Sequence, residues 1–199
     1  MKTSKLFNIA AALTAAVFLS GTAVAKEKAN GPKDINSVVD VAVAANFDVD
    51  GPFFGAFDTL IALLTQDVAS RAAILAALDS RGQYTVFAPT DGAFEDLAET
   101  ALTLGYCSLA DLPAAAVDQV LLYHVAPGRR DAIDVLSSDQ INTKNGEKLG
   151  QEAAVLTDAI GRTANLIPGA IDIMAENGII HAIDAVVLPF LPPPGPGGC

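Results

Sequence analysis

The sequence predicts an α+β fold, in which several helices precede a set of mostly antiparallel strands. Two observations predict it. As far as about residue 122, apolar residues recur at the three- and four-residue intervals of helices with one buried face. Beyond that point, Asn145-Gly146 and Asn177-Gly178 each separate two short apolar runs, which is the pattern of a β-hairpin. The folded body is expected over residues 35–191.

Three sets of apolar residues at helical spacing predict the first three helices. They are Ile35, Val38, Val39 and Ala42; Phe53, Phe57, Leu60, Ile61 and Leu64; and Ile74, Leu75 and Leu78. We expect Ser70 to cap the third of these helices. A later helix is expected from about Pro113 to Leu122, because proline is favoured in the first turn of a helix.

Residues 84–94 (YTVFAPTDGAF) predict a strand that leads into a helix. Successive side chains of a strand point to opposite faces, so Phe87 and its apolar neighbours predict a strand covered on both sides. Pro89 ends the ladder because it has no N–H to donate. Thr90 or Asp91 can then cap a helix that buries Phe94. We interpret the segment as a structural corner without a catalytic role.

Both Asn-Gly pairs predict tight hairpin turns, and the first is expected to be of type I′. The second pair lies between residues 171–175 and 179–188. The latter run carries Ile and Val on both faces, which indicates a buried strand.

Residues 1–25 predict a cleavable signal peptide. Lys2 and Lys5 supply positive charge, residues 6–19 carry none, and Ala23-Val24-Ala25 fits a cleavage site. The uncharged run is shorter than the roughly 20 residues that a membrane-spanning helix needs. Residues 26–34 are expected to be a disordered lead-in, and residues 192–199 (PPPGPGGC) a Pro/Gly tail that does not pack. We expect an exported protein, periplasmic or extracellular, with no transmembrane segment after cleavage.

The net charge limits the classes of partner. The chain carries 12 basic and 23 acidic residues, so the loss of Lys2 and Lys5 would leave a formal charge of −13. Such a surface repels nucleic acid and anionic lipid, whose binding depends on Lys and Arg contacts to phosphate. We therefore expect no nucleic-acid partner, and interpret the acidity as serving solubility, with cation binding as the alternative.

The two cysteines, Cys107 and Cys199, allow one intramolecular disulfide in an exported protein. It would close a loop of about 90 residues and stabilise the fold by about 4–5 kcal/mol. The alternative is that Cys199, at the end of the chain, stays free or bonds to another chain.

Three motifs follow one another along the chain: TVFAPTDGAF at residues 85–94, YHVAPG at 123–128 and NGIIHAIDAVVLP at 177–189. Together and in this order they resemble the fasciclin-type domain, over about residues 35–190. The signature residues, expected to be structural, are Thr85, Phe87, Pro89, Thr90, Asp91, Phe94, Asn177, Gly178, His181 and Pro189. The resemblance implies a wedge-shaped β-sandwich with several helices packed at one side. A lone domain with a signal peptide looks most like the bacterial exported members.

The resemblance also implies adhesion, or binding of protein or glycan partners at the cell surface or envelope, without catalysis. In animal relatives, integrin recognition is placed near the Tyr-His motif and in a short acidic-Ile-Met segment. The matching candidate partner-binding residues are Tyr123, His124, Asp172, Ile173 and Met174. The alternative for all five is a structural role. For Tyr123 and His124 the reason is that a half-buried ring with a polar tip often hydrogen-bonds nearby backbone. The alternative function is a periplasmic small-ligand carrier with an apolar pocket between helices and sandwich.

The motifs of common enzymes do not occur in the sequence. It has no G-x-S-x-G elbow and no Gly-rich phosphate loop, and both histidines, His124 and His181, lie in apolar runs. Zinc would need about four closely spaced ligands. We expect no enzyme activity, no cofactor and no metal, and the remaining catalytic alternative is an acid–base pair of carboxylates. Residues 46–51 (NFDVDG) resemble the start of a calcium loop, but Phe57 occupies the place of its bidentate Glu, and a capped turn between helices explains the same residues.

Overall fold

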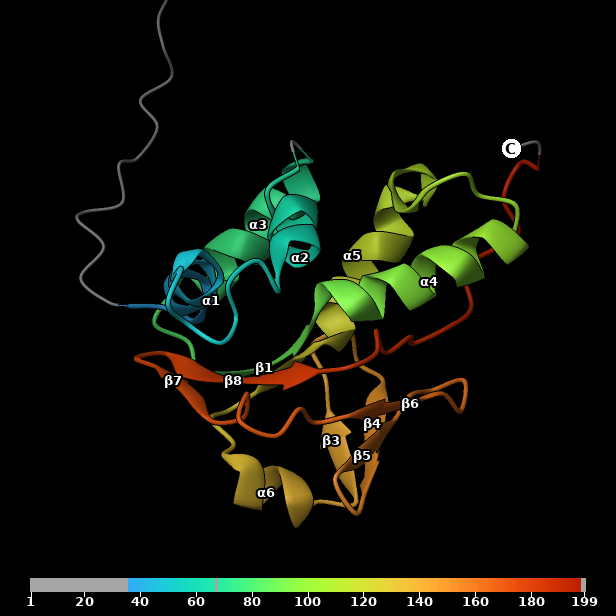
Figure 1. Ribbon diagram of the computed structural model, residues 1–199. Helices are drawn as coiled ribbons and strands as arrows, with labels where there is room; N and C mark the ends of the chain where they lie inside the picture. Colours follow the sequence, from blue (N-terminus) through green and yellow to red (C-terminus); the bar gives the residue numbers. More distant parts are fainter. Residues whose placement is uncertain (1–35, 67, 198–199) are drawn as a thin grey trace, which may run out of the picture. The chain divides into compact units, whose positions relative to one another are not determined.

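Six α-helices and eight strands form the part of the chain that the computed structural model describes, residues 36–66 and 68–197 (Figure 1). The strands build two four-stranded sheets. Helices come first and mostly antiparallel strands later, which confirms the predicted α+β class. The predicted signal peptide and lead-in, and Cys199, lie outside the described residues. The pairing of Cys107 with Cys199 therefore stays a prediction.

The helices follow the predicted apolar patterns, with corrections at their ends. Their bounds are α1 Val38–Phe47, α2 Asp58–Leu64, α3 Ala69–Leu78, α4 Asp91–Thr103, α5 Ala114–Tyr123 and α6 Ala132–Leu136, with a 3-10 turn at Leu109–Asp111. The second helix begins at Asp58 rather than Phe53, because the left-handed φ of 66° at Gly55 is incompatible with a helix there. The prediction that Ser70 caps α3 is wrong: Val68 holds the N-cap position and Ser70 lies inside the helix.

Sheet A has the strand order β2-β1-β8-β7. Its strands are β1 Tyr84–Pro89, β2 Val125–Pro127, β7 Ile173–Ala175 and β8 Gly178–Ile183. The two central strands, β1 and β8, are parallel over six residue pairs, and the two outer pairs are antiparallel. All of β8 and nearly all of β1 is buried, as expected for strands covered on both faces. The predicted strand at 179–188 is shorter than expected, since β8 ends at Ile183, although Val186–Leu188 remain buried.

Sheet B is an antiparallel meander in the order β3-β4-β5-β6. Its strands are β3 Gln140–Asn142, β4 Lys148–Glu152, β5 Val155–Thr157 and β6 Thr163–Asn165. The predicted first hairpin joins β3 to β4, but its turn is not of type I′, because that type needs positive φ at two residues and here only Gly146 has it, at 98°. Instead the Gly146 N–H donates to Thr143 O, and the Asn145 side chain accepts from the Glu147 N–H.

The second predicted hairpin joins β7 to β8, and its Asn-Gly pair is not the turn itself. Ala175 pairs with Gly178, so the two loop residues are Glu176 and Asn177 and the glycine lies in the strand. A Cβ at Gly178 would lie 2.3 Å from Tyr84 O, so β1 and β8 approach each other at a point where only glycine fits. The Asn177 side chain faces inward, where it accepts from the Val38 N–H and donates to the carbonyls of Leu78 and Ser80.

Two apolar cores lie on the two faces of sheet A. Helices α1 to α5 cover one face, and sheet B lies on the other (Figure 1). In β1, Tyr84 and Ala88 belong to the core under the helices, whereas Phe87 belongs to the core between the sheets. This confirms the predicted sandwich with helices at one side. In the described part of the chain, no single helix is long and apolar enough to cross a membrane, and only the pair α2 and α3, bent by 114°, reaches that length and composition together.

The Pro/Gly tail is packed, contrary to the prediction. The Gly195 N–H donates to Leu104 O at 2.7 Å, and the Gly197 N–H donates to Gly105 O at 3.2 Å. The Tyr106 hydroxyl donates to Pro193 O at 2.8 Å. Prolines remove donors from the tail, and its glycine N–H groups supply the bonds to the end of α4.

Candidate functional site

Tyr123, in the Tyr-His motif, is fully buried in the core between the sheets. Its hydroxyl donates to Lys148 O at 2.9 Å and so ties the end of α5 to β4. Burial, helped by the nearby carboxylate of Asp158, raises the pKa of Tyr123 to about 12. The ring is therefore neutral and has no surface for contact with a partner.

His124 is 4 % exposed and joins the end of α5 to the segment after β8. Its Nε2 accepts from the Val187 N–H at 3.2 Å, so the proton lies on Nδ1, which donates to Val120 O at 2.7 Å. Burial lowers the pKa of His124 to about 4, and the bond to Val120 only partly offsets this. A neutral ring with both nitrogens engaged agrees with the structural interpretation of this residue.

The segment Asp172-Ile173-Met174 begins strand β7 at one edge of sheet A. Asp172 has a left-handed φ of 58°, and its carboxylate accepts from the Ala132 N–H at the start of α6, at 2.8 Å. Ile173 is half-buried, whereas Met174 is 54 % exposed. Of the five candidate residues, Met174 has the most surface for contact with a partner.

His181, a signature residue, positions this segment. Its ring is fully buried and stacked on Phe87, with centroids 5.8 Å apart. Nδ1 accepts from the Asp172 N–H at 3.2 Å, and Nε2 donates to Arg130 O at 3.0 Å. Burial lowers the pKa of His181, against smaller opposing effects of the Arg130 carbonyl, Asp172 and Asp131. The structure thus brings the last signature and the candidate segment together. Among the described residues, no hydrogen bond joins Tyr123 or His124 to that segment.

Two further signature residues have roles that local sequence does not reveal. Thr85 Oγ1 donates to Gly128 O and accepts from the Arg130 N–H. These two bonds fix residues 128–130, the segment that follows β2. Asp91 does not cap its own helix with its side chain; its carboxylate accepts from the N–H groups of Asp58 and Thr59 and caps α2. Thr90 holds the N-cap position of α4 without a side-chain bond.

Arg129 was not predicted as a site residue, although it belongs to the only adjacent basic pair of the sequence. Its guanidinium donates to Ala175 O at 3.0 Å and to Met174 Sδ at 3.3 Å. The exposed methionine therefore lies beside an arginine whose orientation is fixed by the backbone of β7. The signal available in the sequence was the position of this pair directly after YHVAPG.

An open groove of about 790 Å³ lies along the surface where α1 packs beside β7. The residues lining it from α1 and its two flanks are Asn36, Asp40, Val41, Ala44, Ala45 and Asp48. The side chains lining it from the other wall are Arg129, Met174, Ala175 and Glu176. The groove therefore brings apolar residues, charged residues and the edge strand of sheet A together.

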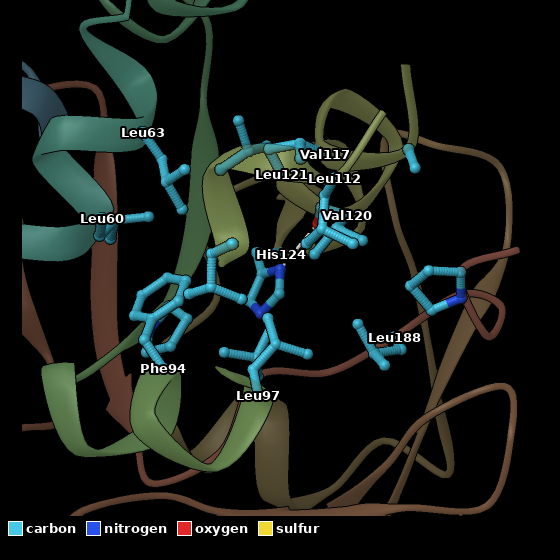
Figure 2. Close-up of a pocket in the computed structure, with 15 residues that line it drawn as sticks. Leu60, Leu63, Phe94, Leu97, Leu112, Val117, Val120, Leu121, His124 and Leu188 are labelled. Atoms are coloured by element: carbon cyan, nitrogen blue, oxygen red, sulfur yellow. Dashed lines mark hydrogen bonds between the residues drawn. The ribbon is translucent and has the colours of Figure 1, made fainter. Parts of the chain in front are cut away.

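A second, apolar cavity lies among α2, α4, α5 and the segment after β8 (Figure 2). Leu97, Leu121 and Leu188 point into it, and His124 supplies its only polar side chain. At about 40 Å³ it holds little more than one water molecule, whereas ligand pockets measure roughly 300–1,000 Å³.

The calcium-like segment forms a turn between helices. Asn46 is buried; its Oδ1 accepts from the Phe57 N–H at 2.7 Å and its Nδ2 donates to Asp58 Oδ1 at 2.8 Å. Asp48 Oδ1 accepts from the Asp50 N–H. These bonds engage the side chains of Asn46 and Asp48, two of the residues at the start of the calcium-like segment. Within residues 36–66 and 68–197, no group of three or more His, Cys, Asp or Glu residues is arranged to hold a metal ion.

Comparison with known proteins identifies the family. The model of the fasciclin domain matches residues 55–189. An uncharacterized protein of Synechocystis sp. is 33% identical over 132 residues, which cover 66% of this chain and 89% of that protein. Transforming growth factor-beta-induced protein ig-h3 of Sus scrofa is 32% identical over 133 residues, or 66% of this chain and 18% of that protein. A solved FAS1 domain pair from the insect cell adhesion molecule Fasciclin I is 20% identical, with a TM-score of 0.44 over 58% of this chain and 43% of that one. On the match to the family model and the Synechocystis relative, the chain belongs to the fasciclin domain family.

Proposed function

We propose that this chain is an exported domain that binds protein or glycan partners at the cell surface or envelope, without catalysis. The observation that carries the proposal is the family match over residues 55–189, nearly all of the folded body. Fasciclin domains are often involved in cell adhesion and occur in extracellular and secreted proteins. The predicted signal peptide at residues 1–25 supports export of this member.

The state of the two histidines supports a role without catalysis. A general base must reach the proton that it abstracts, with a pKa near the working pH. His124 and His181 are both buried, both engaged at each ring nitrogen, and both have a lowered pKa. Members of the family are generally non-enzymatic.

The proposed mechanism is recognition through the exposed edge of sheet A. Met174 and Arg129 there form an apolar and a cationic contact side by side. We expect a contact through this edge to bury less than about 1,200 Å² of surface, which is typical of weak binding. Many copies of the domain on one surface strengthen the attachment, because several contacts form at once.

Deleting the gene and measuring attachment of cells to surfaces, host cells and neighbouring cells tests the proposal. Loss of attachment in at least one setting, restored by the wild-type gene, is expected. Unchanged attachment in every setting would contradict it.

The cavity in Figure 2 favours a second candidate, a carrier of small apolar ligands. Its apolar lining suits such a ligand, but its volume of about 40 Å³ requires the helices to separate before one enters. Native mass spectrometry of the purified protein distinguishes the two: a co-purifying apolar ligand supports the carrier, and the bare mass of the protein counts against it.

A further inference from the structure

Helix α1 is apolar on every side, yet no described residue covers one of its faces. Its sequence, VVDVAVAANF, has apolar residues at eight of ten positions. A helix of this kind belongs in a buried setting, since a surface helix carries one apolar stripe and one polar face. Val38 is buried in the core and the half-buried Val41 packs against that core with part of its side chain, whereas Ala44 is exposed; Val41 and Ala44 line the groove beside β7. Covering that face removes apolar surface from water, which favours binding.

The α1 wall of the groove is fixed at both ends. At its start, the Glu176 N–H donates to Asn36 O at 2.9 Å, and the Val38 N–H donates to Asn177 Oδ1 at 2.7 Å. At its end, the bonds of Asn46 to α2 hold the last turn. A groove whose walls are already held in place loses little conformational entropy when a partner binds.

The opposite wall is formed by the edge strand of sheet A. β7 is the last strand of the order β2-β1-β8-β7, and it presents the exposed Met174 toward the groove. Arg129 lies along this edge with its guanidinium on Ala175 O and Met174 Sδ. An extended peptide laid beside such an edge meets side chains from both walls.

The charges on the groove select the kind of partner. Asp40 lines the groove but its carboxylate accepts from the Ser37 N–H and hydroxyl. The other two carboxylates, Asp48 and Glu176, lie along the groove with one arginine, Arg129, which leaves an excess of one negative charge. Opposite charge across an interface steers encounter and excludes partners of the same sign. Anionic lipids and nucleic acids are therefore excluded, and a neutral glycan brings neither cations nor apolar side chains.

We infer that the groove between α1 and β7 binds an extended segment of a partner protein that carries Lys or Arg beside small apolar residues. The apolar side chains contact Val41, Ala44 and Met174, and the cations lie beside Asp48 and Glu176. The inference rests on the proposed function, because it specifies the chemistry of the protein partner that this function requires.

Fluorescence anisotropy with the full-length chain tests the inference. The probe is a labelled decapeptide in which two lysines flank a run of Ala and Val, and its control has Glu in place of both lysines. We expect binding of the lysine peptide that weakens as salt rises, and at least about tenfold weaker binding of the glutamate peptide. Ala44→Arg places a cation and a long side chain in the groove and is expected to weaken binding of the lysine peptide by about tenfold or more.

Ala76→Arg is the matched control, because Ala76 is also an exposed alanine in a helix, on α3 away from the groove. It is expected to bind the lysine peptide as the wild type does, and both variants should unfold at the wild-type temperature. Equal affinity for the two peptides, no binding of the lysine peptide, or wild-type binding by Ala44→Arg would overturn the inference. So would a concentration-dependent dimer that Ala44→Arg abolishes, since the occupant would then be a second copy.

The cell assay separates failure of this inference from failure of the proposed function. If deletion of the gene reduces attachment and the Ala44→Arg gene restores it fully, the adhesive function stands and the groove is not its site. If deletion changes attachment in no setting, the proposed function itself is wrong.

Discussion

The imidazole of His181 holds the backbone of Asp172, because Nδ1 accepts from the Asp172 N–H at 3.2 Å while Nε2 donates to Arg130 O. Asp172 in turn has a left-handed φ of 58° and accepts from the Ala132 N–H through its carboxylate. One buried ring therefore fixes the start of β7, and with it the position of the exposed Met174.

Replacing Asp172 tests this arrangement. Asp172→Ala should lower the free energy of unfolding by about 1–3 kcal/mol, because alanine loses the bond to Ala132 and is strained at positive φ. Asp172→Asn keeps an acceptor and tolerates this φ, so it should stay within about 0.5 kcal/mol of the wild type. Urea denaturation measures both, and equal losses would contradict the proposed role of the acceptor oxygen.

The neutral state of His124 predicts a loss of stability in acid. Its pKa is about 4 in the folded chain against 6.5 in the unfolded chain, so the unfolded state binds more protons below pH 6.5. This contribution to the free energy of unfolding is complete above pH 6.5 and falls by about 3 kcal/mol as the pH drops to about 4. The lowered pKa of His181 acts in the same direction.

His124→Gln isolates that contribution, because glutamine keeps one donor and one acceptor but does not titrate. The carboxylates contribute equally to the pH dependence of the wild type and of the variant. Urea denaturation at pH 7.5 and pH 4.5 gives the change in the free energy of unfolding for each protein, and the difference between these two changes is the contribution of His124. The variant should be less stable at neutral pH but depend less on pH. Parallel pH profiles would show that His124 does not carry the effect.

Gly178 should tolerate no side chain. The added Cβ of Gly178→Ala would lie 2.3 Å from Tyr84 O and 2.7 Å from Val38 Cγ1, so the parallel pairing of β1 and β8 must separate. We expect a loss of about 3 kcal/mol or more in thermal or urea unfolding. The control is Gly92→Ala on the surface of α4, where the nearest atom is 4.0 Å away and a gain of up to about 1 kcal/mol is expected. A mild effect at Gly178 would contradict the close approach of the strands.

The side chain of Asp91 caps α2 rather than the start of α4, where the sequence had placed the capping role of Thr90 or Asp91. Asp91→Ala should destabilise the protein by about 1 kcal/mol, because it uncaps α2. Thr90→Ala should cost less than about 0.5 kcal/mol, since its side chain makes no capping bond. Chemical denaturation of both variants measures the two losses of stability, and a larger loss for Thr90→Ala than for Asp91→Ala would contradict this assignment of the cap.

Sequence patterns within one segment correctly predicted the elements that depend on the residues of that segment alone. The alternation around Phe87 correctly predicted a strand with two covered faces, and Pro113 correctly marked the start of α5. Contacts between distant segments were beyond such patterns. The fit of Gly178 against Tyr84, and the cap that Asp91 provides for α2, depend on residues far apart in the chain.

The candidate site was predicted in part. The motif resemblance found Met174, which is exposed, but it also proposed Tyr123 and His124, which the structure buries. The apolar residues on either side of Tyr123 and His124 are compatible with a buried or an exposed ring. The sequence does not reveal whether the Tyr123 hydroxyl and the His124 ring nitrogens hydrogen-bond to backbone groups inside the fold. Arg129 and the outer face of α1 were missed, since a single basic residue and an apolar helix have no motif of their own.

Recognition through the edge of sheet A can be tested by measuring attachment of a deletion strain that carries either of two variants. Met174→Glu and Leu102→Glu each place a charge at a comparably exposed apolar residue, 54 % and 53 % exposed, but only Met174 lies on the edge of sheet A. We expect that Leu102→Glu restores attachment and that Met174→Glu does not, although both proteins reach the cell surface in equal amounts. Full attachment with Met174→Glu would contradict recognition through this edge.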